Sequence, residues 1–137
     1  MNLFNGSPET TMLLWSTVLG LVQLFVATSM ASKDQGLAYN LSPRDVAPPP
    51  VSTMTGRLQR AYKNFAETFP LFIAAIVFVT LAGRQDTMSA LGAQLYFGAR
   101  LVYVPVYVSG VIVLRTIVWA VSIIGLVLVL CAGFGLA

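Results

Sequence analysis

The residues of this chain best suited to chemistry lie between Arg57 and Glu67, in the run RLQRAYKNFAE that opens a long apolar segment. If this run is helical, Arg57, Arg60, Asn64 and Glu67 share one face within an arc of roughly 80°, with Lys63 at its edge. Cationic, amide and carboxylate groups on one face suit an anionic ligand that also forms hydrogen bonds.

Glu67 is expected to lie below the surface of a membrane. The predicted helix runs to about Ala82, and Glu67 is about 22 Å from that end, within a hydrocarbon core about 30 Å thick. Carboxylates at such depth almost always face a bundle interior or a wet cavity. Two interpretations remain open: a helix start whose basic residues meet lipid headgroups, or a polar pocket for a ligand.

A second set of candidate residues lies nearer the C-terminus. Arg100, Tyr103 and Tyr107 are spaced i, i+3 and i+7, so they share one face of a predicted helix. Arg115 and Thr116 follow at the start of another apolar segment. Arginines that extend to the membrane surface and an interfacial belt of tyrosines are the alternative explanation.

The composition indicates an integral membrane protein. Of 137 residues, 57% are hydrophobic and 9% charged, whereas a soluble domain is about one quarter charged. The length predicts one domain over residues 1–137. The absence of histidine excludes His-based acid–base chemistry and His metal sites, and the single Cys131 cannot form an internal disulfide. We interpret the net charge of +3 as membrane topology rather than nucleic-acid binding.

The apolar segments predict an all-α fold, an integral membrane four-helix bundle with helices at about 10–31, 53–82, 87–108 and 111–135. The first segment carries no charge and is long enough to span a bilayer; its N-terminal flank lacks Lys and Arg, so we interpret it as a retained helix rather than a signal peptide. Residues 32–56 read as a loop with turn and polyproline character, because they contain Ser42-Pro43 and Pro48-Pro49-Pro50.

The lysine and arginine positions predict the orientation in the membrane. The first connection and the adjoining start of the second helix hold Lys33, Arg44, Arg57, Arg60 and Lys63, whereas the two ends of the chain hold none. The first connection is therefore predicted to be cytoplasmic, with both termini outside. Every charge embedded in the second, third and fourth helices then falls in the cytoplasmic half of the membrane, which favours a polar pocket there.

The run from Arg57 to Glu67, continued by Thr68, Phe69 and Pro70, resembles the MAPEG family, the membrane-associated proteins in eicosanoid and glutathione metabolism. The family pattern has an arginine, an Arg-Asn pair and a Glu that bind glutathione; here Lys63 stands in place of the arginine of that pair. Arg115-Thr116 resembles an Arg-Ser pair that opens the fourth helix in members of the family.

The resemblance implies a homotrimer that holds glutathione as co-substrate between neighbouring subunits, in the cytoplasmic half of the membrane. By position, the second helix would bind its carboxylates, amide and amino group through Arg60, Lys63, Asn64 and Glu67. The third helix would line the site with Arg100, Tyr103 and Tyr107. Arg115 and Thr116 would lie beside the thiol.

The leading hypothesis is a glutathione-dependent transferase or peroxidase acting on a lipophilic electrophile. Arg115 would stabilise the thiolate, because a free thiol has a pKa of about 8.5, and the Thr116 hydroxyl would donate a hydrogen bond. The family also includes a non-catalytic lipid-binding member, so a lipid- or glutathione-binding protein of the same fold is the alternative. A small transporter subunit is a third hypothesis, which the cations around Glu67 disfavour because they hold its carboxylate ionised.

The predicted orientation can be checked by labelling introduced cysteines. A cysteine at Ser42 should react with a membrane-impermeant reagent from the cytoplasmic side only, and a cysteine at Ser7 from the outside only, because the basic first connection is expected inside. The opposite labelling pattern would contradict the topology.

Overall fold

The computed structural model describes residues 6–136, and the regular secondary structure of this part of the chain is all α-helical, as predicted. Its helices are α1 (Pro8–Gln35), α2 (Leu37–Asn40), α3 (Thr53–Leu81), α4 (Thr87–Ser109) and α5 (Ile112–Gly133). The predicted location of the chain ends concerns residues 1–5 and 137 as well, which lie outside the described residues.

Helix α1 is longer than the predicted 10–31. Ser7 caps its start by accepting a hydrogen bond from the backbone N–H of Thr10 at 3.3 Å. At the other end it continues to Gln35, and Lys33 in the last turn suits the negative end of the helix dipole. Gly36 then ends α1 with a φ of 86°, in the range that favours glycine.

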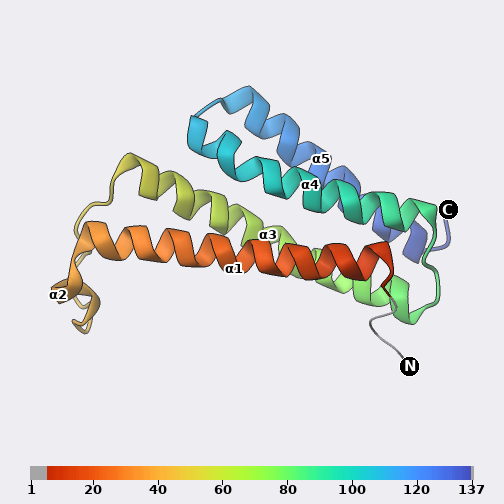
Figure 1. Ribbon diagram of the computed structural model, residues 1–137, viewed down its shortest axis with the longest axis horizontal. Coiled ribbons are helices and arrows are strands. Elements are labelled where there is room, and N and C mark those ends of the chain that lie inside the picture. Colours follow the sequence, from red (N-terminus) through yellow and green to blue (C-terminus); the bar gives the residue numbers. More distant parts are fainter. Residues whose placement is uncertain (1–5, 137) are drawn as a thin grey trace.

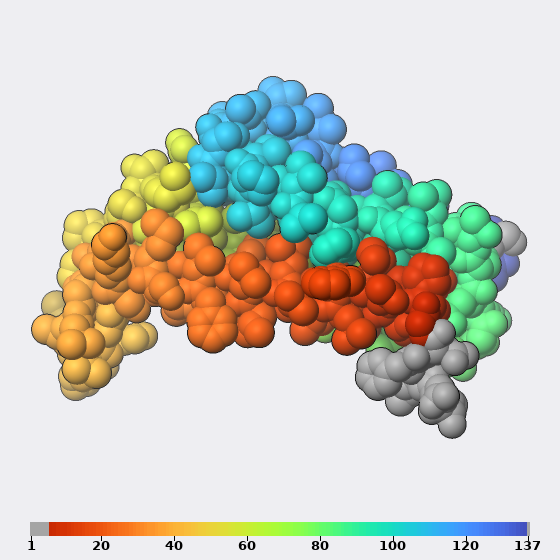
Figure 2. All heavy atoms as spheres, viewed as in Figure 1, coloured from red at the N-terminus to blue at the C-terminus, as the bar shows by residue number. Residues whose placement is uncertain are grey.

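The connection between α1 and α3 contains only the single short helix α2 and is fastened at its base. Asp34 accepts hydrogen bonds from the backbone N–H of Ser52 at 2.9 Å and from the Thr55 hydroxyl at 2.6 Å. Ser52 is in turn the N-cap of α3. The segment between these residues projects beyond the end of α1, at the left of Figure 2.

The four long helices lie in two antiparallel pairs (Figure 1). Helices α1 and α3 run side by side, and α4 and α5 form a hairpin across them. Pro70 lies inside α3 and Pro105 inside α4, and neither proline ends its helix. The turn between α3 and α4 leads into a capping box, in which Asp86 and Ser89 each accept a backbone N–H from the other.

The core lies where α3, α4 and α5 meet. The rings of Phe72 and Tyr96 stack with centroids 4.0 Å apart, and both side chains are fully buried. Small and branched apolar residues fill the remaining space: Ala75, Ile76, Val79, Ala93, Leu126, Val129 and Ala132. This packing fixes α4 against α3, which is the pair of helices that carries most of the candidate site.

Glycines allow α4 and α5 to approach at backbone distance. A Cβ atom at Gly92 would lie 2.5 Å from the carbonyl oxygen of Gly125, and one at Gly125 would lie 2.6 Å from that of Gly92. Small residues at such crossings are a common device of helices that pack in membranes. The pair therefore sets the separation of α4 and α5.

Within residues 6–136, three helices are long and apolar enough to cross a membrane: α1, α3 and α5. Helix α4 has a comparable length, but Gln94, Arg100 and several tyrosines interrupt its apolar sequence. Helix α4 nevertheless lies inside the bundle, where it contacts α1, α3 and α5.

We expect Gly125→Ala to destabilise the protein by about 1–3 kcal/mol, the usual effect of inserting a methyl group into a filled contact. The free energy of unfolding, measured by denaturant titration in detergent micelles, would report it. Gly98→Ala is the matched control, because Gly98 lies inside the neighbouring long helix α4 but a Cβ there meets nothing within 4 Å. Equal effects of the two substitutions would contradict the close contact.

Candidate functional site

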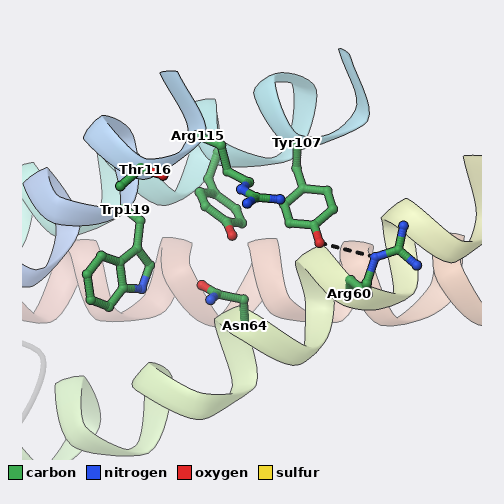
Figure 3. A pocket seen from close by; sticks show the side chains of 7 residues that line it. Arg60, Asn64, Tyr107, Arg115, Thr116 and Trp119 are labelled. Carbon is green, nitrogen blue, oxygen red and sulfur yellow. Dashed lines mark hydrogen bonds between the residues drawn. The ribbon is translucent and has the colours of Figure 1, made fainter. Parts of the chain in front are cut away.

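A polar pocket of about 360 Å³ opens between α3, α4 and α5 (Figure 3). Six of the residues predicted for the site line it, two from each helix: Arg60 and Asn64, Tyr103 and Tyr107, and Arg115 and Thr116. The fold thus brings to one cavity predicted residues that are spread over more than fifty positions of the chain.

Tyr107 stands between the two arginines of the pocket (Figure 3). Its hydroxyl oxygen accepts a hydrogen bond from Nε of Arg60 at 3.2 Å. The guanidinium carbon of Arg115 lies 4.9 Å from the centre of its ring, within the range of a cation–π contact. One tyrosine therefore contacts both cationic groups that line the cavity.

Arg100 does not line the pocket and lies behind Asn64, with only 1% of its surface exposed. Its guanidinium donates to Oδ1 of Asn64 at 2.6 Å and to the Thr68 hydroxyl at 2.8 Å. The rings of Tyr96 and Tyr103 flank it at 5.6 Å and 5.3 Å. Because Arg100 occupies the amide oxygen of Asn64, the N–H groups of that amide are the part left to bind a ligand.

Arg57 points to the end of α4 instead of the pocket. It donates to the carbonyl oxygen of Val108 at 2.8 Å, which satisfies one of the free carbonyls at a helix C-terminus. Its guanidinium also lies against Gly110, where a Cβ would come within 3.1 Å of it. Gly110 has a φ of 82°, so glycine suits this position on both counts. Arg57 thus fastens the α4–α5 turn to α3.

Lys63 and Glu67 are exposed on α3 and do not line the pocket of a single chain. Both lie beyond Arg60 on the side away from Asn64, as the helical period of about 100° per residue requires. The predicted polar face is therefore divided in three: its middle lines the pocket, Arg57 binds α4, and these two residues face outward.

Trp119 lines the pocket and was not among the predicted site residues. It follows Arg115 by four positions, so it lies on the same face of α5, and this spacing was the available signal. The Thr116 hydroxyl donates to the carbonyl oxygen of Ile112 at 3.1 Å. Its lone pairs, and not its proton, are therefore directed outward in this structure, which differs from the predicted donor role.

The charges of the pocket suit an anionic ligand. Two guanidinium groups, Arg60 and Arg115, line it, and none of its described lining residues is acidic. A third guanidinium, that of Arg100, lies directly behind Asn64. Arginine presents several N–H donors in a planar fork that matches a carboxylate. Three aromatic side chains, Tyr103, Tyr107 and Trp119, form much of the remaining lining and offer apolar surface.

Comparison with models of known protein families gives a match. A model described as the MAPEG family matches residues 12–135, which include all the long helices almost completely. None of the curated proteins matches the chain. The matching family is the one that the Arg57–Glu67 run resembles.

Thr68→Val should destabilise the protein by about 1–3 kcal/mol, because its hydroxyl contacts both the guanidinium of Arg100 and, at 3.0 Å, the Tyr96 hydroxyl in a buried position. Denaturant titration in micelles would measure the change. Thr28→Val, on the exposed face of α1, should have little effect, because the Thr28 hydroxyl bonds only to the carbonyl of its own helix at Leu24. A neutral Thr68→Val would show that the buried network is not stabilising.

Proposed function

This chain belongs to the MAPEG family of multi-pass membrane proteins, and on that premise we propose that it uses glutathione to modify a lipophilic electrophile. The family includes glutathione transferases and related enzymes. The observation that carries the proposal is the placement of Arg60 and Arg115 in one cavity without an acidic lining residue.

Glutathione matches the donors of the pocket in charge. It carries two carboxylates and one ammonium group, and therefore one net negative charge. Arg60 suits a carboxylate through its planar fork, and the Asn64 amide suits a peptide carbonyl because Arg100 leaves its N–H groups free. A low-dielectric position inside the membrane strengthens each of these contacts.

Arg115 is the residue that we assign to the thiol. Its guanidinium stabilises the thiolate, which is the nucleophilic form of the group. The thiolate sulfur then attacks an electrophilic carbon; a C–S bond forms, and the electron pair of the bond that breaks leaves with the departing group or the opened ring oxygen. The Arg115 guanidinium is held in position beforehand, and it acts most strongly when negative charge is concentrated on the sulfur. Thr116 can assist only after its hydroxyl turns from Ile112.

The second substrate is expected to come from the lipid phase. Trp119 forms an aromatic wall of the pocket and is 39% exposed on α5, a helix that is long and apolar enough to cross a membrane. An apolar molecule dissolved in the bilayer can therefore reach the sulfur position from the side of α5.

We assign Lys63 and Glu67 to a site completed by neighbouring copies in a homotrimer. Both are exposed on a membrane-spanning helix, where charged groups normally face protein or a wet cavity rather than lipid. Glutathione also brings an ammonium group, for which the pocket of one chain offers no carboxylate among its described residues. Glu67 of an adjoining copy would supply it.

Replacing Arg115 separates catalysis from binding. We expect Arg115→Ala to lower kcat at least tenfold while glutathione affinity changes much less, because the contact is strongest once charge develops on sulfur. Turnover with a generic aromatic electrophile and calorimetric titration with glutathione give the two quantities. The ultraviolet absorbance of bound thiolate should appear near neutral pH in the wild type and only at higher pH in the variant.

Arg115→Lys is the matched control and should restore only part of the rate, since lysine lacks the planar fork. An unchanged kcat in Arg115→Ala would remove Arg115 from the mechanism. A wild type that binds glutathione but turns over no electrophile would instead favour the binding-protein alternative.

Replacing Glu67 tests the shared site. Glu67→Gln should weaken glutathione binding by about 1–3 kcal/mol, the range for a hydrogen bond to a charged group, whereas Ala66→Ser, the adjacent exposed position, should change it little. The protein in mild detergent should have the mass of three chains. A stable monomer that binds glutathione with full affinity would argue against an intersubunit site.

A further inference from the structure

Tyr107 occupies the two cationic groups that the proposed ligand needs. Its hydroxyl takes the Nε–H of Arg60 at 3.2 Å, and its ring lies 4.9 Å from the guanidinium carbon of Arg115. Both arginines line the same cavity as Tyr107 (Figure 3). One side chain thus contacts both of the arginines that an anion would bind.

The contacts of Tyr107 differ from those of its neighbour Tyr103, which lines the same cavity. Tyr103 is buried, with 4% of its surface exposed, and its ring faces Arg100 at 5.3 Å. Tyr107 is half-buried, and the centroid of its ring lies 5.6 Å from that of Tyr103. The pair therefore offers two hydroxyls in one pocket, of which only that of Tyr107 contacts Arg60.

The backbone around Tyr107 permits its side chain to move. Tyr107 lies in the last turn of α4, three residues before Gly110. Pro105, two residues earlier, has no N–H with which to continue the helical hydrogen bonds. Helix ends are also the least protected part of a helix. A rotation about the side-chain torsions of Tyr107 would break its contacts with both arginines.

We propose that Tyr107 is a positioning residue that competes with the ligand: it contacts both Arg60 and Arg115, and its hydroxyl is displaced from Arg60 when an acidic group of the ligand binds there. The inference rests on the proposed function for the identity of the ligand, glutathione. It adds that the Tyr107 hydroxyl weakens the binding of a carboxylate at the Arg60 end of the pocket.

Whether one substitution tightens or weakens glutathione binding distinguishes this role from direct ligand contact. Tyr107→Phe keeps the ring on Arg115 and removes the oxygen that accepts from Arg60. If the hydroxyl competes with the ligand, its loss tightens glutathione binding by about three- to tenfold, the range of one net hydrogen bond. If the hydroxyl binds the ligand, or if it only supports the structure, the substitution weakens binding or leaves it unchanged.

Calorimetric titration of the full-length protein with glutathione tests the proposal. Tyr107→Phe should bind more tightly than the wild type, and Tyr103→Phe, which removes a hydroxyl from the same pocket without touching Arg60, should show no such gain. Equal or weaker binding by Tyr107→Phe, or the same gain in Tyr103→Phe, would overturn the competing role while leaving the proposed function in place.

Absence of glutathione binding would refute the proposed function. In that case a second measurement still tests whether the Tyr107 hydroxyl competes with an anion for Arg60. The chain has two tryptophans, so Trp15→Phe leaves Trp119 of the pocket as the single reporter. Iodide, an anionic quencher, should quench Trp119 more strongly after Tyr107→Phe, and neutral acrylamide should not. Adding Arg60→Gln should abolish the gain. Unchanged iodide quenching would overturn the proposal.

Discussion

The fold and the site both depend on a guanidinium buried between two helices. Arg100 of α4 donates to Asn64 and Thr68 of α3, and a charge without water must keep such partners. In the part of the chain that the structure describes, its Nε has no hydrogen-bond partner. The two hydrogen bonds from Arg100 to Asn64 and Thr68 fix the rotation of α4 against α3. They thereby set the direction in which Tyr103 and Tyr107 point.

The stability of this arrangement and its chemistry come from opposite ends of the helices. The apolar core around Phe72 and Tyr96 and the backbone contact of Gly92 with Gly125 hold α3, α4 and α5 together. The polar pocket opens farther along, beyond Arg100, where α5 begins and α4 ends. The closely packed core of α3, α4 and α5 thus supports the pocket at the α4–α5 turn, where few contacts hold the cationic side chains.

Much of the fold was predictable, because apolar segments and turn residues indicate helices and their connections directly. The helical period also placed Arg60 and Asn64 on one face, and Tyr103 and Tyr107 on another. The period could not show that Arg57 would turn to the carbonyl of Val108 or that Arg100 would lie behind the pocket, since both depend on where α4 crosses α3. The residue spacing within one helix does not indicate the distances between its side chains and those of another helix.

The fastening of Asp34 to Ser52 and Thr55 has a consequence for how freely the protein can vary. It closes the segment between them into a loop whose two ends are already held together. The entropic cost of closing a flexible loop rises only slowly with its length, and the described residues within it make one side-chain hydrogen bond to a long helix, from Asn40 to the Ser32 carbonyl of α1. This loop is therefore the place where evolution or an engineer can insert, delete or graft residues while the helices remain in register.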